Sequence, residues 1–489
     1  MACGNRGRLQ SKATTILLAD PPFADRRNMY AETLPNLGLL YLYSSLRREL
    51  PNLRVLYMDG RRSRQNHLDE VSDIRPCIYG ISFASPYAEL AYTLINEIKT
   101  KFPSTLVVCG GAHPTAEPIG VLENSEADVC CMSEGEQTIV EIVKSHLSQG
   151  DITSVSGIAY KATTGEIKVN PNRPLVTSLD GLPFPAWDAV DLHRFSGCRK
   201  RKGRLSAAIV ASRGCPFNCT FCSNPVWKLQ KPWLRKRSPQ NIAKEVALLY
   251  EQGVREIYIR SDEMNPEIDW AIAVFEALAD LSHADLFFQC NLRARPISDR
   301  LAKALSRANC WLVHLGIESG SQRVLDGIKK ELTLEEIQTG CETLKKYNIR
   351  IHAFMMLCQV WEQNGQLQVE TTRDMWRSLW TMLTYRWKGF IDYMSWSCAA
   401  PLPGSELYRV ARKYNLIKNP PPFENAIIPH EISLIVPGAT RSAMALLRTL
   451  GLIMQGIFLM ISRDFRTKKN LLLNLGDVLT KVKYIFRFR

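Results

Sequence analysis

Short apolar runs alternate with segments of helical periodicity along the first third of the chain. Buried strands are predicted at residues 15–19, 53–57, 78–82, 106–109 and 129–132, with helices at residues 34–50 and 87–101. Strands alternating with helices indicate a parallel, doubly wound α/β sheet, which binds ligands beyond the carboxyl ends of its strands. The candidate ligand contacts are the residues at those ends: Ser82, Gly110, Gly111, Glu134, Gly135 and Glu136.

A second alternating region follows a hairpin predicted at residues 155–169 and a Pro-rich linker at residues 179–186. Six strands are predicted there, at residues 207–212, 256–260, 286–289, 311–315, 350–356 and 393–397. Helices are predicted at residues 239–251, 268–281, 299–307, 334–347, 372–385 and 404–414. Six strand–helix units fit a partial (β/α)6 barrel, whose active site should lie at the carboxyl ends of its strands.

The C-terminal region changes character after Pro420-Pro421-Pro422. Residues 443–461 are almost entirely apolar, but Arg441, Arg448, Gln455 and Ser462 recur every seven residues, which predicts one polar stripe on a long helix. The central Arg448 argues against a membrane span. A second apolar segment, residues 471–486, ends in basic residues. Two interpretations stay open: a helical cap packed on the barrel, or an interfacial helical pair that docks on anionic lipid.

These patterns divide the chain into four expected parts: an N-terminal domain (residues 12–150), a linker (151–204), the barrel (205–415) and a helical region (416–489). With 489 residues, 46% of them hydrophobic, the chain can form two or three cores. The net charge of +14 suggests an acidic partner, but no nucleic-acid-binding module is visible. Fourteen cysteines with a polar N-terminus lead us to expect a reducing, cytoplasmic setting.

The most specific chemical motif is the stretch from Arg213 to Cys222. It places Cys215, Cys219 and Cys222 at C-x3-C-x2-C spacing directly after an apolar run. Three thiolates on a short loop can hold three irons of a cubane cluster and leave the fourth iron open. A zinc site would want a fourth Cys or His close by, and none follows at zinc-finger spacing. The alternative reading is three apolar cysteines without a metal.

This motif resembles that of the radical S-adenosylmethionine (SAM) superfamily. The resemblance implies a [4Fe-4S] cluster whose open iron chelates SAM, and a donor such as flavodoxin or ferredoxin whose electron cleaves SAM to a 5'-deoxyadenosyl radical. It also implies SAM contacts at the strand ends. Phe221 would pack near the adenine, Glu263 and Glu318 would accept hydrogen bonds from the ammonium or ribose, and Arg293 would neutralise the carboxylate. Ser319, next to Glu318, is a further expected contact. Alone, each charged residue is as easily a solvated charge or a helix cap.

The N-terminal domain resembles the cobalamin-binding domain found in front of many radical SAM enzymes. The matching segments are Pro35-Asn-Leu-Gly-Leu-Leu-Tyr, Gly80-Ile-Ser82, Gly110-Gly111 and Ser133-Glu-Gly-Glu136. Ser133 replaces the family's usual glycine, so that turn is altered. The Asp-x-His-x-x-Gly pattern is missing after the first strand, and we therefore expect cobalamin without a protein histidine on its lower face. Considered alone, Gly110-Gly111 is more often a simple tight turn.

One barrel loop departs from the family pattern. Relatives usually carry a Gly-x-Pro-Gly-Glu-Thr turn after the fifth strand, whereas residues 356–365 form a longer, aromatic segment. This segment either shapes the substrate pocket or is a divergent surface loop.

The resemblance spans residues 15–415 and implies a cobalamin-dependent radical SAM enzyme. The expected reaction is methylation of an unactivated carbon of a small or lipophilic substrate, with methylcobalamin as donor and no nucleic acid involved. Two alternatives remain: radical cyclisation or rearrangement without methyl transfer, and a non-catalytic iron–sulfur or cobalamin sensor. Peripheral membrane contact through the C-terminal helices is a further expectation.

Overall fold

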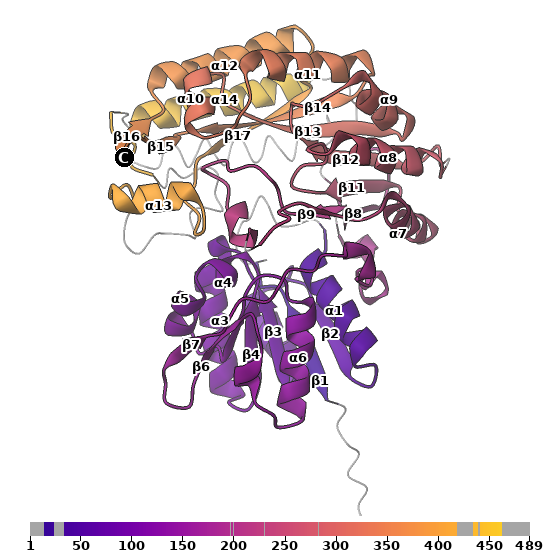
Figure 1. Cartoon of the computed structure of the whole chain (residues 1–489), viewed down its shortest axis with the longest axis vertical. Coiled ribbons are helices and arrows are strands. Elements are labelled where there is room, and N and C mark those ends of the chain that lie inside the picture. Colours follow the sequence, from indigo (N-terminus) through magenta and orange to yellow (C-terminus); the bar gives the residue numbers. More distant parts are fainter. Residues whose placement is uncertain are drawn as a thin grey trace, which may run out of the picture. The chain divides into compact units, whose positions relative to one another are not determined.

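The computed structural model describes residues 14–23, 34–417, 434–438 and 441–461, apart from residues 196, 199, 229 and 282. These residues form two compact units. The first contains residues 14–23, 38–83 and 90–173, and the second contains residues 34–37, 84–89 and the described residues from 174 onward. Most elements of both units are labelled in Figure 1.

The first unit is built on a seven-stranded sheet of order β2-β1-β3-β4-β5-β6-β7. Five strands are parallel: β1 (Thr15–Ala19), β2 (Arg54–Met58), β3 (Ile78–Ser82), β4 (Leu106–Gly110) and β5 (Val129–Cys131). The predicted hairpin forms β6 (Ile158–Lys161) and β7 (Ile167–Val169), and β6 extends the sheet antiparallel to β5. The predicted doubly wound sheet is therefore confirmed, with two antiparallel strands added at one edge.

The helices of the first unit bury apolar side chains against this sheet. They are α1 (Leu37–Glu49), α2 (Arg64–Ile74), α3 (Ala88–Lys101), α4 (Ala112–Ala116), α5 (Pro118–Asn124) and α6 (Glu136–Leu147). Sheet residues Ile16 and Val108 share one core cluster with Ile142 of α6. The polar α2 was not expected; it begins at Ser63, whose hydroxyl accepts the Asn66 N–H at 3.1 Å.

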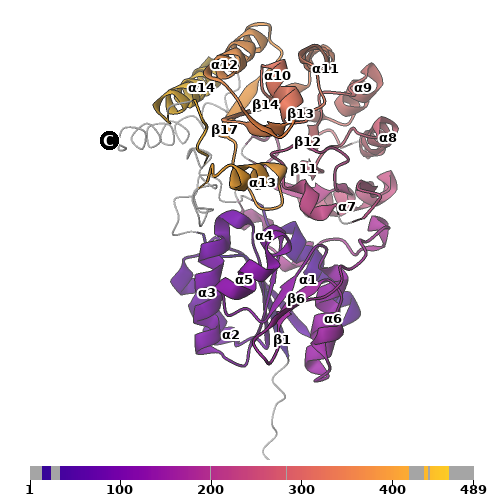
Figure 2. The same ribbon diagram turned by 60° about the vertical axis from the view of Figure 1, so that its left-hand side comes forward.

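The second unit contains a six-stranded parallel sheet of order β17-β14-β13-β12-β11-β8. Its strands are β8 (Ser206–Val210), β11 (Glu256–Arg260), β12 (Phe287–Leu292), β13 (Cys310–Glu318), β14 (Arg350–Leu357) and β17 (Tyr393–Cys398). The helices are α7 (Pro239–Glu251), α8 (Ile268–Ala279), α9 (Asp299–Arg307), α10 (Gln322–Gly327), α11 (Leu334–Lys346), α12 (Thr372–Trp387) and α13 (Glu406–Lys413). Successive parallel strands joined by helices on one side confirm the predicted partial barrel (Figures 1 and 2).

The aromatic segment after β14 is a folded part of this barrel. It forms the antiparallel hairpin β15 (Val360–Gln363) and β16 (Gln366–Val369) around Asn364-Gly365, both in the left-handed region. Trp361 is buried against Val324, Ile328 and the partly buried Phe221. The hairpin therefore supports the loop that carries the cysteine motif.

The predicted C-terminal helix is present as α14 (Arg441–Ile461), which packs against β17 and α12. Arg448 is buried, and a Cβ on Gly451 would lie 2.7 Å from the Trp396 ring. Arg448, a member of the predicted polar stripe, is therefore packed against the barrel. The segment at residues 471–486 lies outside the described residues. Among the described residues, no helix is both long and apolar enough to cross a bilayer.

Candidate functional site

The cysteine loop leaves β8 through the short strand β9 (Ser212–Arg213). The buried Thr220 holds the loop at its centre: its N–H donates to Ile328 O at 3.0 Å, and its carbonyl accepts the Leu407 N–H at 2.8 Å. The loop is thus fixed both to the segment after α10 and to α13. The side chains of Cys215, Cys219 and Cys222 are all partly buried and free of disulfide bonds.

The thiols of this loop suit an iron–sulfur cluster. Burial raises the pKa of Cys215 to about 12 and the pKa of Cys222 to about 11, so both thiols hold their protons until a bound metal displaces them. Among the described residues, no three His, Cys, Asp or Glu side chains converge as ligands of a single ion. A cubane needs only one thiolate for each of three irons. The donor set therefore fits the cluster expected from the sequence.

Two charged side chains order the cysteine loop, a contact that the sequence predicted for neither of them. Asp262, directly after β11, accepts hydrogen bonds from the Gly214 N–H and from the Asn224 side chain. Lys228 donates to the Phe217 carbonyl and, at 2.8 Å, to Asn218 Oδ1. A polar contact on each side limits the positions that the three thiols can take.

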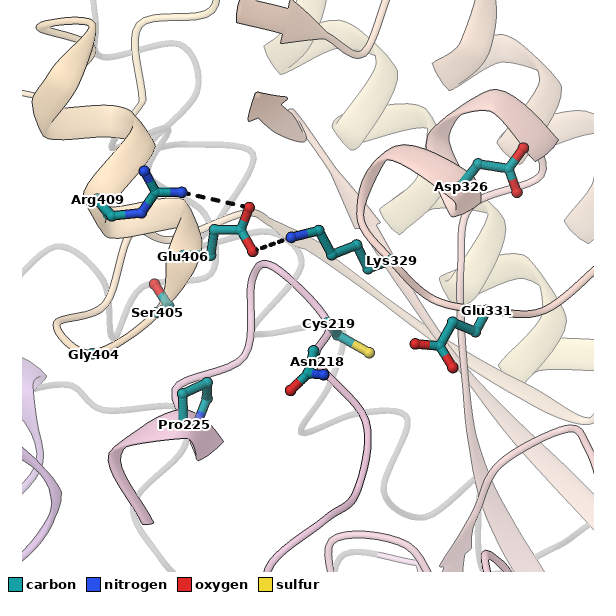
Figure 3. Close-up of a pocket in the computed structure, with 10 residues that line it drawn as sticks. All are labelled: Asn218, Cys219, Pro225, Asp326, Lys329, Glu331, Gly404, Ser405, Glu406 and Arg409. Carbon is teal, nitrogen blue, oxygen red and sulfur yellow. Dashed lines mark hydrogen bonds and ion pairs between the residues drawn. The ribbon is translucent and has the colours of Figure 1, made fainter. Parts of the chain in front are cut away.

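Cys219 also lines a cavity of about 770 Å³, shown in Figure 3. Charged side chains from the segment after α10 and from α13 form much of its wall. Lys329 Nζ lies 2.6 Å from Glu406 Oε2, and Arg409 lies 3.7 Å from the other oxygen of the same carboxylate. One side of the cysteine loop is therefore exposed to a polar cavity.

Glu318 ends β13 in an unusual backbone conformation. Its φ is +67°, and the register between β13 and β14 shifts between Gly316 and Glu318. The bulge turns the carboxylate toward Lys330, whose Nζ lies 3.1 Å from Glu318 Oε1 with both side chains buried. A Cβ on Gly316 would lie 2.4 Å from that oxygen and 2.8 Å from Lys330 Nζ. The missing side chain at position 316 is therefore what leaves room for the ion pair.

Arg293 and Glu263 present unpaired polar atoms at neighbouring strand ends. The Arg293 side chain is 1% exposed, and its guanidinium carbon lies 3.6 Å from the Phe217 ring centroid. Among the described residues, Arg293 Nε and Nη2 and Glu263 Oε2 have no hydrogen-bond partner. Burial raises the pKa of Glu263 to about 7, against the opposing effect of Lys330 and Arg293. A buried cation and a carboxyl that both lack partners fit the carboxylate and ammonium groups of SAM.

Asn265 fixes the backbone of Arg293. Its side-chain oxygen accepts the Arg293 N–H at 2.8 Å, and its amide donates to the Arg293 carbonyl at 2.8 Å. This buried asparagine was missed in the sequence, since nothing in the pattern separates it from a loop residue. Lys330 was missed as well, because a Lys-Lys pair after a helix normally indicates solvated charge.

The last two expected SAM contacts have different surroundings. Phe221 packs beside Trp361 and lies 5.9 Å from Lys330 Nζ, so it is close to the Glu318 ion pair. The Ser319 hydroxyl accepts the Ser321 N–H at 3.1 Å and pairs with Ser378 Oγ at 3.2 Å. Ser319 thus stabilises the turn after β13 with its side chain.

The candidate cobalamin contacts lie at the ends of β3, β4 and β5 in the first unit. Gly111 has φ +99°, and a Cβ there would lie 2.8 Å from Phe83 O and 2.9 Å from Ser82 Oγ. The glycine at position 111 is therefore required by the close packing of this turn against the end of β3. Ser133 adopts φ +64°, so the left-handed turn persists although serine replaces glycine. The expected residues at these ends are Ser82, Gly110, Gly111, Glu134, Gly135 and Glu136.

His113 follows Gly111 by two residues and is already engaged within the first unit. Its Nε2 lies 2.8 Å from Tyr92 Oη, and its ring packs against Phe83. Burial lowers the pKa of His113 to about 4, so the ring is neutral. Cobalamin bound without a protein histidine on cobalt stays a prediction.

Comparison with known proteins identifies both units. The radical SAM superfamily model matches residues 209–362, and the B12-binding domain model matches residues 28–143. The solved cobalamin-dependent SAM radical enzyme OxsB, with aqua-cobalamin and SAM bound, superposes with a TM-score of 0.69 at 19% identity, over 97% of this chain and 72% of OxsB. The methyltransferase TsrM from Kitasatospora setae gives 0.65 at 16% identity, over 83% and 77% of the two chains. These likenesses establish the fold.

Curated relatives with similar sequences show the family. An uncharacterised methyltransferase of Pyrococcus horikoshii, PH0819, is 30% identical over 413 residues, which cover 83% of this chain and 85% of the relative. The anaerobic magnesium-protoporphyrin IX monomethyl ester cyclase of Rubrivivax gelatinosus is 28% identical, over 73% and 62% of the two chains. This protein therefore belongs to the cobalamin-dependent radical SAM enzymes and takes a [4Fe-4S] cluster, SAM and cobalamin as cofactors.

Proposed function

We propose that this enzyme transfers a methyl group to an unactivated carbon atom of a small or lipophilic substrate. The supporting observation is the similarity to PH0819, a relative named as a methyltransferase, along 85% of that protein's length. A second relative, the cytidylyl-2-hydroxyethylphosphonate methyltransferase of Streptomyces wedmorensis, is 27% identical over 69% of this chain and 67% of its own length.

The chain's own residues have distinct tasks in this proposal. When bound, the cluster and SAM supply a 5'-deoxyadenosyl radical, and cobalamin supplies a methyl group. Cys215, Cys219 and Cys222 hold the irons. Arg293 binds the SAM carboxylate, while Glu263 and Glu318 accept hydrogen bonds from its ammonium or ribose. These groups need little rearrangement, because the surrounding strand ends already hold them in place.

Cobalamin binding is assigned to the strand ends of the first unit. Gly110 and Gly111 let the cofactor approach the backbone, and Ser82 and Ser133 add hydroxyl groups beside them. Glu134, Gly135 and Glu136 begin the turn into α6. Electron paramagnetic resonance of the cob(II)alamin form should show no coupling to a protein nitrogen.

The inner face of the barrel supports a substrate with an apolar or aromatic part. Side chains alternate along β14: Met355 is buried toward the helices, whereas Phe354 on the other face is 38% exposed. The Phe354 ring stacks on His314 with centroids 5.8 Å apart and 17° between the planes. Burial lowers the pKa of His314 to about 3, with Lys200 and Arg260 acting in the same direction, so the ring itself is neutral and aromatic although two cations lie near it.

Radical cyclisation without methyl transfer is the second candidate, because the cyclase of Rubrivivax gelatinosus is 28% identical to this chain. The mass of the product separates the two reactions. Methylation adds one methylene unit and carries label from methyl-labelled SAM, whereas cyclisation adds neither. A sensor would cleave no SAM at all.

The decisive experiment uses the reconstituted full chain with SAM, cobalamin and a reductant. Formation of both S-adenosylhomocysteine and 5'-deoxyadenosine supports methyl transfer, since the two SAM molecules have different fates. Replacing Cys215, Cys219 or Cys222 by Ala should abolish both products, whereas replacing the buried Cys290 should abolish neither. Production of 5'-deoxyadenosine alone, with substrate present and no labelled product, would refute the methyltransferase proposal.

We further propose that a flavodoxin or ferredoxin reduces the cluster in the cytoplasm. The cavity beside Cys219 supports this, because it brings solvent close to one cluster ligand. Charge reversal at Arg409, on the rim of this cavity, should slow reduction by flavodoxin but leave reduction by dithionite unchanged.

A further inference from the structure

Helix α12 exposes a stripe of large apolar side chains. Trp376, Trp380, Leu383 and Trp387 are 53%, 72%, 39% and 93% exposed. At 3.6 residues per turn, these four positions fall within about 60° of one another around the helix axis. The adjacent side of the helix, centred about 100° from this stripe, is apolar too, with Met375, Leu379 and Met382 buried. A helix that is apolar on two sides normally has a partner on both of them.

Helix α14 continues this surface. The two helices are in contact and lie side by side in Figures 1 and 2. Leu446, Ile453 and Ile457 of α14 are 58%, 43% and 41% exposed. Single exposed apolar residues are ordinary, but seven on two adjoining helices form a patch of the kind that marks an interaction site. The docking face is defined by these seven residues: Trp376, Trp380, Leu383, Trp387, Leu446, Ile453 and Ile457.

The exposed charges on α12 and directly after it are of one sign. Arg373, Arg377 and Lys388 are exposed on or next to α12. The sole acidic residue of α12, Asp374, is buried and accepts hydrogen bonds from Thr371 and Ser321. Helix α14 contains no acidic residue at all. The binding partner must therefore accommodate the tryptophan and leucine side chains at the centre of the docking face. It must also attract the positive charges at the edge of that face.

We propose that the docking face binds the surface of an anionic lipid membrane. Tryptophan prefers the boundary between lipid headgroups and acyl chains, and exposed arginine and lysine are attracted to anionic headgroups. An amphipathic helix lying in the interface plane combines these two features. Docking through the sides of α12 and α14 also agrees with the absence of a bilayer-spanning helix among the described residues. This proposal does not depend on which reaction the enzyme catalyses.

Vesicle binding by the full-length holoenzyme tests the proposal. Vesicles of phosphatidylcholine with phosphatidylglycerol should sediment the protein, whereas pure phosphatidylcholine should bind it at least about tenfold more weakly, and salt should reduce the difference. The triple variant Trp376→Ser, Trp380→Ser, Trp387→Ser should lose at least about tenfold in partitioning. The matched control is Leu248→Ser, because Leu248 is an exposed apolar residue on α7 away from this face.

The remaining outcomes decide among other occupants of the face. Unchanged SAM cleavage and unchanged thermal unfolding in the triple variant would show that it is folded, so that its loss of binding supports the proposal. Brominated lipids should quench tryptophan fluorescence in the parent protein and much less in the triple variant. Absence of vesicle binding by the parent protein overturns the proposal. A dimer that needs the tryptophans and does not bind vesicles also overturns it. Vesicle binding that persists in the triple variant but disappears when residues 463–489 are deleted has the same consequence.

Discussion

Lys330 Nζ lies 3.1 Å from Glu318 Oε1, and both side chains are buried at the mouth of the barrel. Burial opposes the charged form of Lys330, yet the neighbouring Glu318, Cys219 and Glu263 raise its pKa. The lysine is therefore a fixed positive charge between the cysteine loop and the carboxyl groups that we assign to SAM. It compensates a carboxylate that would otherwise be costly to bury.

Replacing Lys330 by Met should weaken SAM binding and stability together. It leaves Glu318 buried without its partner, which typically costs about 3–5 kcal/mol when one member of a buried pair is removed. We expect at least a tenfold rise in the dissociation constant for SAM, measured by equilibrium binding to the anaerobic, cluster-loaded protein. Lys329→Met is the matched control, because Lys329 is half-exposed and pairs with Glu406 instead of Glu318. Equal effects of the two substitutions would contradict the assignment.

Arg293→Lys tests recognition of the SAM carboxylate. Lysine keeps the charge but loses the planar pair of donors, and it cannot stack on Phe217 as guanidinium does. SAM affinity should fall by about 10- to 100-fold, which corresponds to roughly 1.4–2.8 kcal/mol. The cluster content, followed by iron analysis and absorbance, should stay unchanged. The neighbouring Arg295 is half-exposed and pairs with Glu336, so Arg295→Lys should have no effect on SAM affinity.

Most of the architecture could be predicted from the sequence because the buried strands are short, apolar and regularly spaced. The strands at Thr15–Ala19, Ile78–Ser82 and Glu256–Arg260 agree with the predicted bounds. The hairpin after β14 was missed, although Asn364-Gly365 is the usual two-residue turn signal between strands. Gln366–Val369 does alternate polar and apolar residues, but its four residues are the shortest run that indicates a strand, so the signal was overlooked.

The residues of the candidate site, too, could be predicted only in part. The cysteines, Glu263, Arg293 and Glu318 could be placed at strand ends because they follow recognisable strands. Lys330 and Asn265 could not, since their roles depend on contacts between distant segments: Lys330 with Glu318, and Asn265 with Arg293. The burial of Arg448 could not be predicted either, because it depends on tertiary contacts that no periodicity can show.

Gly111→Ala should impair cobalamin binding. The new methyl group would lie 2.8 Å from Phe83 O at a φ of +99°, so the ends of β3 and β4 must separate. Gly165→Ala is the matched control: it has φ +84° but no atom within 4 Å of its added Cβ, so it bears only the backbone strain of about 1 kcal/mol. Absorbance titration with hydroxocobalamin should show loss of affinity for Gly111→Ala alone. Retention of full affinity would argue against cobalamin binding at these strand ends.

Glu370 gives the second unit a pH-dependent stability. Its Oε2 accepts the Gln359 N–H at 3.1 Å, while its Oε1 and the Gln359 side-chain amide have no hydrogen-bond partner among the described residues. Burial raises the pKa of Glu370 to about 8 from an ordinary value of 4.5, against the opposing effect of the Gln359 N–H. The folded protein therefore keeps a proton that the unfolded chain releases near pH 4.5.

Because the folded pKa is the higher one, this group's contribution to stability is fully present below pH 4.5 and is lost as the pH rises to about 8. Within that window the loss is at most roughly 1.4 kcal/mol per pH unit. Glu370→Gln removes the titrating proton, so the variant should gain stability relative to the parent protein as the pH rises from about 4.5 to about 8. Thermal unfolding of both proteins across that range measures the difference, with the exposed Glu335→Gln as control. Parallel pH profiles for the parent protein and Glu370→Gln would show that Glu370 is ionised in the folded state.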